Sequence, residues 1–92
     1  MTERRSKVAI FGDILRTIYK KNGKAKPTHI LYGANLSHDR LKMHLNSLIE
    51  QGFIEKESED GKNFYVLTNK GKEFLSGYNK MDHFFDAFGV QI

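Results

Sequence analysis

The chain has 92 residues, of which 39% are apolar and 28% are charged, and it contains no cysteine. This composition suits one ordinary globular domain and argues against disorder, while the absence of cysteine excludes disulfides and thiolate metal sites. No apolar run reaches the length of a membrane span or a signal segment. We therefore expect an intracellular, cytoplasmic protein with no membrane partner.

The basic residues are concentrated in the first third of the chain. Residues 1–26 hold eight cations and two acids, a net charge of +6, whereas the remaining residues hold seven cations and nine acids, a net charge of −2. A basic segment suits a polyanion such as nucleic acid, although a solvated basic helix face has the same composition. Charge alone leaves both interpretations open.

The first predicted helix runs from about Ser6 to Lys21 and has an amphipathic pattern. Its apolar residues recur on one side: Ile10, Phe11, Ile14, Leu15 and Ile18. Asn22-Gly23 supplies the left-handed residue that ends a helix. We find no chemistry on this helix and expect it to support the core. The segment 24–26 is expected to be extended, because a residue before proline avoids helical angles.

Two helices joined by a tight turn are predicted between Pro27 and Gly52. The second helix starts at Pro27 or Thr28, with Thr28 as its expected N-cap. The segment 33–35, Gly-Ala-Asn, forms the turn, because glycine and asparagine tolerate the positive φ that such a turn requires.

The third helix has the clearest sequence signature. Ser37 stands at the N-cap position, and Leu36 and Leu41 have the spacing of a hydrophobic staple. Its buried stripe is Leu41, Leu45, Leu48 and Ile49. The opposite face carries Asp39, Arg40, Met43, Asn46, Ser47 and Glu50, with Lys42 and His44 on the flanks. Such side chains read base edges or hold phosphates when a helix enters the major groove, but any solvent-exposed helix also has a polar face.

Residues 53–57 and 63–67 predict two strands, joined through Asp60-Gly61, which is a strong hairpin signal. This hairpin would be the wing of a winged helix. It carries four acids, Glu55, Glu57, Glu59 and Asp60, against Lys56 and Lys62. Because acids close to phosphates repel them, we expect only Lys62 at the tip to contact DNA.

The last helix is capped by Thr68 and runs from about Asn69 to about Phe88. Its large apolar residues follow a heptad pattern: Phe74, Tyr78, Met81, Phe85 and Phe88, widened by Leu75 and Phe84. Beyond Tyr78 the helix is expected to leave so small a domain, so its apolar face needs a partner. A second copy of the same helix is the favoured partner, and the alternative is a helix folded back over its own domain.

Two runs carry a resemblance that covers about residues 6–85: THILYGANLSHDRLKMHLNSLIEQGFIE and YVLTNKGKEFL. The chain resembles the archaeal winged helix-turn-helix DNA-binding family that includes the ten-kilodalton dimeric chromatin proteins of thermoacidophilic archaea. The shared pattern is a Thr-started second helix, a Tyr-x-Ala-Asn-Leu-Ser turn and a Leu-Thr-x-x-Gly-x-x-Phe-Leu start of the last helix.

The resemblance implies double-stranded DNA binding with limited sequence preference, and a dimer formed by the last helices as an antiparallel coiled coil. It implies that Ser37, Arg40, Lys42 and Asn46 belong to the recognition helix. It also implies that Tyr78, Met81 and Phe85 belong to the dimer contact. The chain departs from the family in its acidic hairpin and in a C-terminal end rich in Phe and Gly.

No catalytic constellation is present in the sequence, so we do not expect an enzyme. There is no phosphate-binding glycine pattern, no HExxH and no pair of carboxylates in an apolar context. The four histidines, His29, His38, His44 and His83, do not have metal-ligand spacing. We expect no metal, no cofactor and no small-molecule ligand.

We therefore expect a mainly α protein with a small β-hairpin (α+β), built as a winged helix-turn-helix with an extended C-terminal helix. Residues 1–7 would form a basic arm, 8–68 the DNA-binding domain and 69–92 the dimerisation helix. It would bind duplex DNA as a nucleoid-associated regulator or chromatin protein. The expected DNA-binding residues are Arg4, Arg5, Lys7, Thr28, His29, Ser37, His38, Arg40, Lys42, Met43, His44, Asn46, Ser47 and Lys62. The expected dimerisation residues are Phe74, Tyr78, Met81, Phe84, Phe85 and Phe88.

Two rival functions remain open at this point. A winged helix that docks on another protein would use the acidic hairpin and the aromatic last helix, and it would bind DNA weakly. A sensor-type repressor would hold a small molecule between the last helix and the body, although no residue pattern marks such a pocket.

Overall fold

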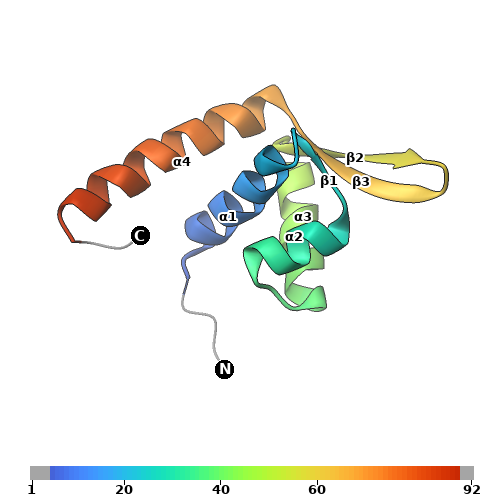
Figure 1. Ribbon diagram of the computed structural model, residues 1–92, viewed down its shortest axis with the longest axis horizontal. Coiled ribbons are helices and arrows are strands. Elements are labelled where there is room, and N and C mark those ends of the chain that lie inside the picture. The colour runs from blue at the N-terminus through green and yellow to red at the C-terminus, as the bar shows by residue number, and fades with distance from the viewer. Residues whose placement is uncertain (1–4, 90–92) are drawn as a thin grey trace.

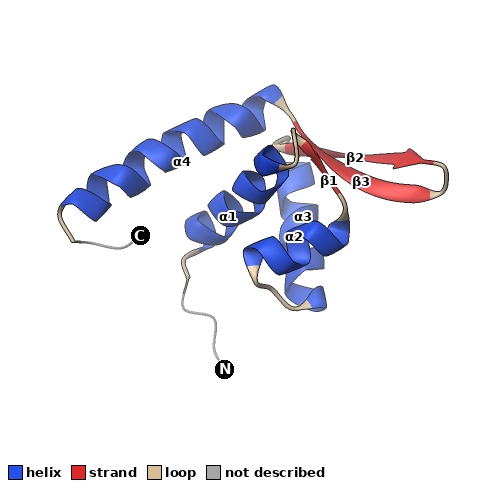
Figure 2. Ribbon diagram, in the orientation of Figure 1, coloured by secondary structure: helices blue, strands red, loops and turns tan. Residues whose placement is uncertain are grey.

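The computed structural model describes residues 5–89, which form four helices and three strands (Figures 1 and 2). In chain order they are α1 (Lys7–Lys20), β1 (Lys24–Ala25), α2 (Pro27–Ala34), α3 (His38–Glu50), β2 (Ile54–Glu59), β3 (Lys62–Leu67) and α4 (Asn69–Ala87). The chain extends over 47 × 32 × 21 Å, with the β2–β3 hairpin and the end of α4 at opposite ends of the long axis. No helix among the described residues is long and apolar enough to cross a membrane.

Helix α1 runs through the middle of the core. The Ser6 hydroxyl accepts a hydrogen bond from the Ala9 backbone N–H at 3.1 Å, which caps its first turn. The predicted apolar side is buried, and Ile14, Leu15 and Ile18 have no exposed surface. Asn22 and Gly23 take positive φ values of 62° and 84°, so the predicted helix end is confirmed.

Helix α2 begins differently from the prediction. Its N-cap is Lys26, Pro27 occupies the first helical position, and Thr28 lies exposed within the first turn, so Thr28 as the cap was wrong. Gly33 and Ala34 belong to the helix rather than to the turn. Asn35 alone supplies the left-handed residue, with φ of 54°, before the chain enters α3.

Helix α3 follows the sequence signature closely. The Ser37 hydroxyl accepts from the Arg40 backbone N–H at 3.3 Å, and Gly52 ends the helix region with φ of 81°. Leu36 and Leu41 are both buried, as a hydrophobic staple requires. The stripe residues Leu41, Leu45 and Leu48 face the core, and Ile49 is half-buried.

The three strands form one antiparallel sheet in the order β1-β3-β2. The short β1 pairs Lys24 with Val66, which confirms an extended segment before Pro27. The hairpin is longer at its tip than predicted, because Glu59 pairs with Lys62 across a two-residue turn. Asp60 and Gly61 have φ values of 50° and 77°, the backbone geometry that favours Asp-Gly in such turns.

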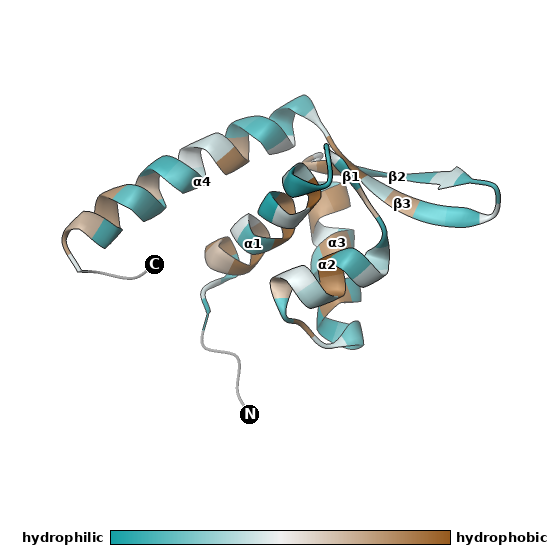
Figure 3. Ribbon diagram, in the orientation of Figure 1, coloured by the Kyte–Doolittle hydropathy of each residue, from teal (hydrophilic) through white to brown (hydrophobic). Residues whose placement is uncertain are grey.

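Helix α4 starts at the end of the sheet and then leaves the domain. The Thr68 hydroxyl accepts from the Gly71 backbone N–H at 3.0 Å, which confirms the predicted cap. Leu75 and Tyr78 are 4% and 7% exposed, so this part of α4 belongs to the core. Beyond them the helix projects, and Figure 3 shows apolar residues at its free end. The elements and their order confirm the predicted winged helix-turn-helix with an extended C-terminal helix.

Candidate nucleic-acid interface

Most polar residues nominated on α3 are accessible. His38, Arg40, Lys42, Met43 and Asn46 are exposed, and Ser47 is half-buried. Met43 is unusual for a surface helix, because 55% of this apolar residue is exposed. The helix thus presents cationic, amide and thioether side chains to solvent, beginning at its capped N-terminus.

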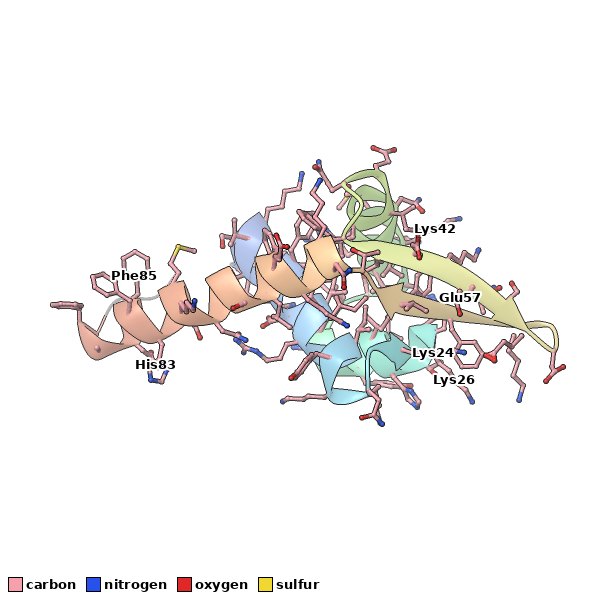
Figure 4. The ribbon with its side chains drawn as sticks, turned by 90° about the horizontal axis from the view of Figure 1, so that it is seen from above. Lys24, Lys26, Lys42, Glu57, His83 and Phe85 are labelled. Carbon is pink, nitrogen blue, oxygen red and sulfur yellow. The ribbon has the colours of Figure 1, made fainter. Side chains whose placement is uncertain are left out.

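These α3 residues divide between two flanks. Arg40, Met43 and Ser47 line a hollow of about 330 Å³ whose other wall includes Arg5 and Lys7 at the start of α1. The structure therefore brings the end of the basic arm beside α3. Lys42 lies instead at the end of the molecule that carries the hairpin, together with Lys24, Lys26 and Glu57 (Figure 4).

His44 does not belong to the accessible face, so its nomination as a DNA contact was wrong. Only 6% of the residue is exposed, and its ring packs edge-on against Phe11 at a centroid distance of 5.8 Å. The sequence placed His44 on the flank of the stripe, and α1 covers that flank. His44 is therefore part of the contact between α1 and α3.

The basic arm is only partly free to reach a phosphate. Arg5 forms an ion pair with Asp13 at 2.7 Å and donates a hydrogen bond to the Asn35 carbonyl at 3.1 Å. Arg5 thus connects α1 to the turn between α2 and α3. Lys7 is exposed, with its ammonium 5.5 Å from the Phe11 ring centroid, and Arg4 lies outside the described residues.

The N-terminus of α2 offers an exposed cation that the sequence reasoning missed. Lys26 is the N-cap residue, and the exposed Thr28 and His29 follow it in the first turn. A helix N-terminus carries partial positive charge, so Lys26 and the first turn together suit a phosphate. The signal was available in the sequence, because Lys26 is the last cation of the basic first third and immediately precedes Pro27.

The hairpin is acidic in the structure as in the sequence. Glu55, Glu57, Glu59 and Asp60 are exposed, and Lys62 is exposed at the tip. Lys24 forms ion pairs with Glu59 and, at 3.9 Å, with Glu57. Its ammonium also lies 4.7 Å from the Phe64 ring centroid, so the charge of Lys24 is directed toward the hairpin rather than toward solvent.

The nominated dimerisation residues fall into two groups. Phe74 packs on Phe53 at 4.8 Å between ring centroids, and Tyr78 is buried against α1. Tyr78 therefore belongs to the core of its own domain, which corrects its placement in a contact between subunits. Phe74 is half-buried against that core, and its contact with a second copy stays a prediction. The other four form what we call the tip cluster: Met81, Phe84, Phe85 and Phe88.

The tip cluster is apolar and open to solvent. Met81, Phe84 and Phe88 are 39%, 60% and 69% exposed. The Phe84 ring lies 5.6 Å from that of Phe85 and 5.1 Å from that of Phe88. Figure 4 shows Phe85 and His83 on opposite sides of the helix, so the helix end has an aromatic side and a more polar one.

Within residues 5–89, no three histidine or acidic side chains come close enough together to hold a metal ion. The arrangement offers exposed cations, helix N-termini and polar side chains on a protruding helix. These groups suit the recognition of a polyanion.

The sequence comparisons agree with the fold. The family described as winged helix-turn-helix matches residues 4–85. Two uncharacterized proteins of Methanocaldococcus jannaschii are 36% and 34% identical over 72 and 73 residues, which are 78% and 79% of this chain. The chain spans only 31% of the length of the first relative and 69% of the second.

Solved structures with similar folds include DNA-binding proteins and regulators. Sso10a-2, a DNA-binding protein from Sulfolobus solfataricus, has a TM-score of 0.81 at 24% identity, covering 91% of this chain and 85% of that one. A MarR family transcriptional regulator from Silicibacter pomeroyi has a TM-score of 0.73 at 19% identity, covering 85% and 53%. TubR bound to 24 bp of tubC, from Bacillus thuringiensis, has a TM-score of 0.68 at 18% identity, covering 79% and 82%. At these identities the likeness concerns the fold.

Proposed function

The chain belongs to the winged helix-turn-helix family, and from that premise we propose that it binds double-stranded DNA as a homodimer. The observation that carries the proposal is the exposed polar surface of α3, where Arg40, Lys42 and Asn46 are open to solvent. These side chains suit the donor and acceptor pattern of the major groove, and Met43 suits a thymine methyl group. In such folds the second helix of the pair enters the major groove.

Phosphate contacts would position α3 along the duplex. Two exposed cations are available for such contacts: Lys7, which lines one hollow with Arg40, and Lys26 at the start of α2. The N-termini of α2, after Lys26, and of α3, after Ser37, also favour anions. The acidic hairpin would stay away from the phosphates, because Glu55, Glu57 and Asp60 are exposed along it and would repel them. Lys62 at its tip is the exception.

A second copy of the chain is the partner that we propose for the tip cluster. Four large apolar residues lie on the part of α4 that projects from the domain, where no other described element covers them (Figures 1 and 3). A two-fold dimer brings the same patch from both subunits together, so an apolar patch on a projecting helix is self-complementary. The division between the DNA-binding part and the dimer-forming part would then lie within α4, near Asn79, rather than at residue 68.

The dimer would either regulate transcription or organise chromatin. These roles differ in how strongly DNA binding depends on the base sequence. The rival function is docking on another protein through the acidic hairpin and the aromatic end of α4, and it requires weak DNA binding. Measurement of the affinity for random-sequence duplex DNA therefore separates these functions.

The test is a titration of a fluorescent random-sequence duplex followed by anisotropy, repeated at several salt concentrations. DNA binding predicts that log affinity falls with log salt by about 0.9 for each phosphate neutralised. Lys42→Ala should weaken binding, while Lys72→Ala, which removes the same charge from an exposed site on α4, should not. Competition by other sequences then distinguishes a regulator from an architectural protein. Absence of binding at low salt would refute the proposal and favour protein docking.

A further inference from the structure

Arg16 on α1 holds three residues of α4 at the place where that helix leaves the domain. Its Nη2 donates a hydrogen bond to Oδ1 of Asn79 at 2.8 Å and lies 3.7 Å from Oδ2 of Asp82. Its guanidinium carbon lies 5.4 Å from the centroid of the Tyr78 ring. The Arg16 side chain therefore contacts two consecutive residues of α4, Tyr78 and Asn79, and also Asp82 one turn further along the helix.

Gly12 lies one turn before Arg16 on α1 and packs against the same ring, that of Tyr78. A Cβ atom built on Gly12 would lie 2.3 Å from Cε2 of Tyr78, so the aromatic ring rests directly on the α1 backbone. Tyr78 is only 7% exposed in this position. A larger residue at 12 would displace the ring, and the crossing point of α4 over α1 is thus set by close packing.

These contacts lie where α4 leaves the domain, so a small change in the direction of the helix there produces a larger displacement at its far end. Figure 1 shows α4 running beside α1 and continuing beyond it, and Figure 4 shows from above that α4 passes across α1. The part from Asn79 to Ala87 is nine residues long, about 13 Å at the rise of an α-helix. A change of about 20° in the direction of α4 would therefore move its end by about 5 Å.

We propose that Gly12, Arg16, Tyr78, Asn79 and Asp82 form a clamp that fixes the direction of α4 relative to α3. The inference rests on the proposed dimer: if two subunits meet through the tip cluster, the clamp sets the separation of the two recognition helices. It thereby determines the spacing of DNA half-sites that one dimer engages. Arg16 acts as a positioning residue and needs no contact with DNA.

The chemistry of Arg16 favours a geometric role over a purely stabilising one. Its side chain and that of Asp82 are 36% and 43% exposed, and ion pairs so exposed contribute little to stability. A planar guanidinium that lies over the Tyr78 ring, donates a hydrogen bond to Asn79 and forms an ion pair with Asp82 restricts the orientation of α4. Loss of Arg16 should consequently loosen the direction of α4 while the domain stays folded.

The absence of cysteine allows a direct test with two nitroxide labels in one chain. We would label Glu50→Cys at the end of α3 and Ala87→Cys at the end of α4, both exposed positions, so that the second label lies at the end of the lever. Dilution with excess unlabelled protein makes pulsed electron paramagnetic resonance report only the distance within one chain. The parent should give one narrow distance distribution. Arg16→Ala should shift or broaden it by about 5 Å, as the lever estimate requires.

Two further variants provide a control for Arg16→Ala and an alternative to it. Lys20→Ala removes one positive charge from the exposed end of α1 and should leave the distribution unchanged. If Arg16→Ala fails to give the circular dichroism of the parent, Asn79→Ala combined with Asp82→Ala removes the same contacts from the α4 side. A distribution identical to that of the parent in a folded variant lacking these contacts overturns the clamp.

The dependence on the proposed dimer is tested separately. Sedimentation of the Glu50→Cys protein shows whether dimers form, and in a dimer the label reports the distance between the two α3 helices. The clamp predicts that Arg16→Ala broadens this distance between subunits as well. A monomer by sedimentation refutes the dimer without affecting the result obtained within one chain. A broadened intrachain distance with an unchanged distance between subunits would refute the role of the clamp in spacing.

Discussion

The rings of His44 and Phe11 meet edge to face, with centroids 5.8 Å apart and ring planes at 83°. This contact joins α1 to α3. His44 therefore determines how α3 is seated in the domain and is too deeply buried to contact a nucleic acid.

We expect His44→Ala to lower the free energy of unfolding by about 1–3 kcal/mol, because it removes buried ring contacts between α1 and α3. Urea denaturation followed by circular dichroism measures this loss. DNA affinity, determined at a temperature where the variant is fully folded, should stay within twofold of the parent, about 0.4 kcal/mol. A large loss of affinity with unchanged stability would instead restore His44 as a DNA contact.

Arg5 and Lys7 carry the same charge at the start of α1, yet we expect removal of Arg5 to change the stability of the fold and removal of Lys7 to change DNA binding. Arg5→Ala should lower stability by about 0.5–1.5 kcal/mol, because Arg5 pairs with Asp13 and donates to the Asn35 carbonyl. Lys7→Ala should leave stability unchanged and reduce the salt dependence of DNA binding by about one phosphate contact. Denaturation and anisotropy on the same two proteins make each variant the control for the other.

Charge at the tip cluster should separate the proposed dimer without unfolding the domain. Phe84→Asp combined with Phe88→Asp places two acids on residues that are 60% and 69% exposed. Sedimentation equilibrium should then report monomers with the helical content of the parent. Tyr78→Asp is the contrasting variant, because it buries a charge against α1 and should destabilise the fold itself. Persistent dimers in the double variant would exclude the tip cluster as the interface.

Alkaline pH should destabilise the fold through two tyrosines. Burial raises the pKa of Tyr78 above its ordinary value of 10.0, and the nearby Asp13 and Asp82 raise it further, against a lowering by Arg16 and Arg5. Burial also raises the pKa of Tyr65. Because the folded state holds these protons more tightly than the unfolded state, stability is fully present below pH 10 and falls as the pH rises above it.

Denaturation measured between pH 9 and about 11 tests this dependence, since it brackets the ordinary tyrosine pKa. Tyr78→Phe should flatten the fall in stability because the phenol is gone while the ring remains. Tyr32→Phe is the matched control, because Tyr32 is 80% exposed and should have little influence on the slope. Equal slopes in the parent and in Tyr78→Phe would contradict the assignment.

Local sequence signals predicted most of the fold. Ser37 and Thr68 cap α3 and α4, and Asp60-Gly61 makes the hairpin turn, because each of these features depends only on neighbouring residues. Thr28 was misassigned for a local reason as well. Proline favours the first helical position, which moves the cap of α2 to Lys26.

The remaining errors concern contacts between distant segments. His44 lies on a flank of α3 that the helical period alone leaves ambiguous, and it is buried because α1 happens to cover that flank. Tyr78 fits a heptad equally well in a core or in a dimer, and Gly12 on α1 decides in favour of the core. The spacing of apolar residues identifies which side of a helix is buried, but it does not identify the segment of the chain, or the second copy, that covers that side.

The acidic hairpin has a second consequence, which concerns aggregation. In the order β1-β3-β2, strand β2 lies at the edge of the sheet, where its unpaired backbone groups are able to add another strand. Glu55, Glu57 and Glu59 are exposed along this edge, so two copies that approached edge to edge would bring like charges together. The acids that we propose keep the hairpin away from phosphates would thus also oppose sheet extension between copies, which leaves the helical end of the molecule for the proposed dimer.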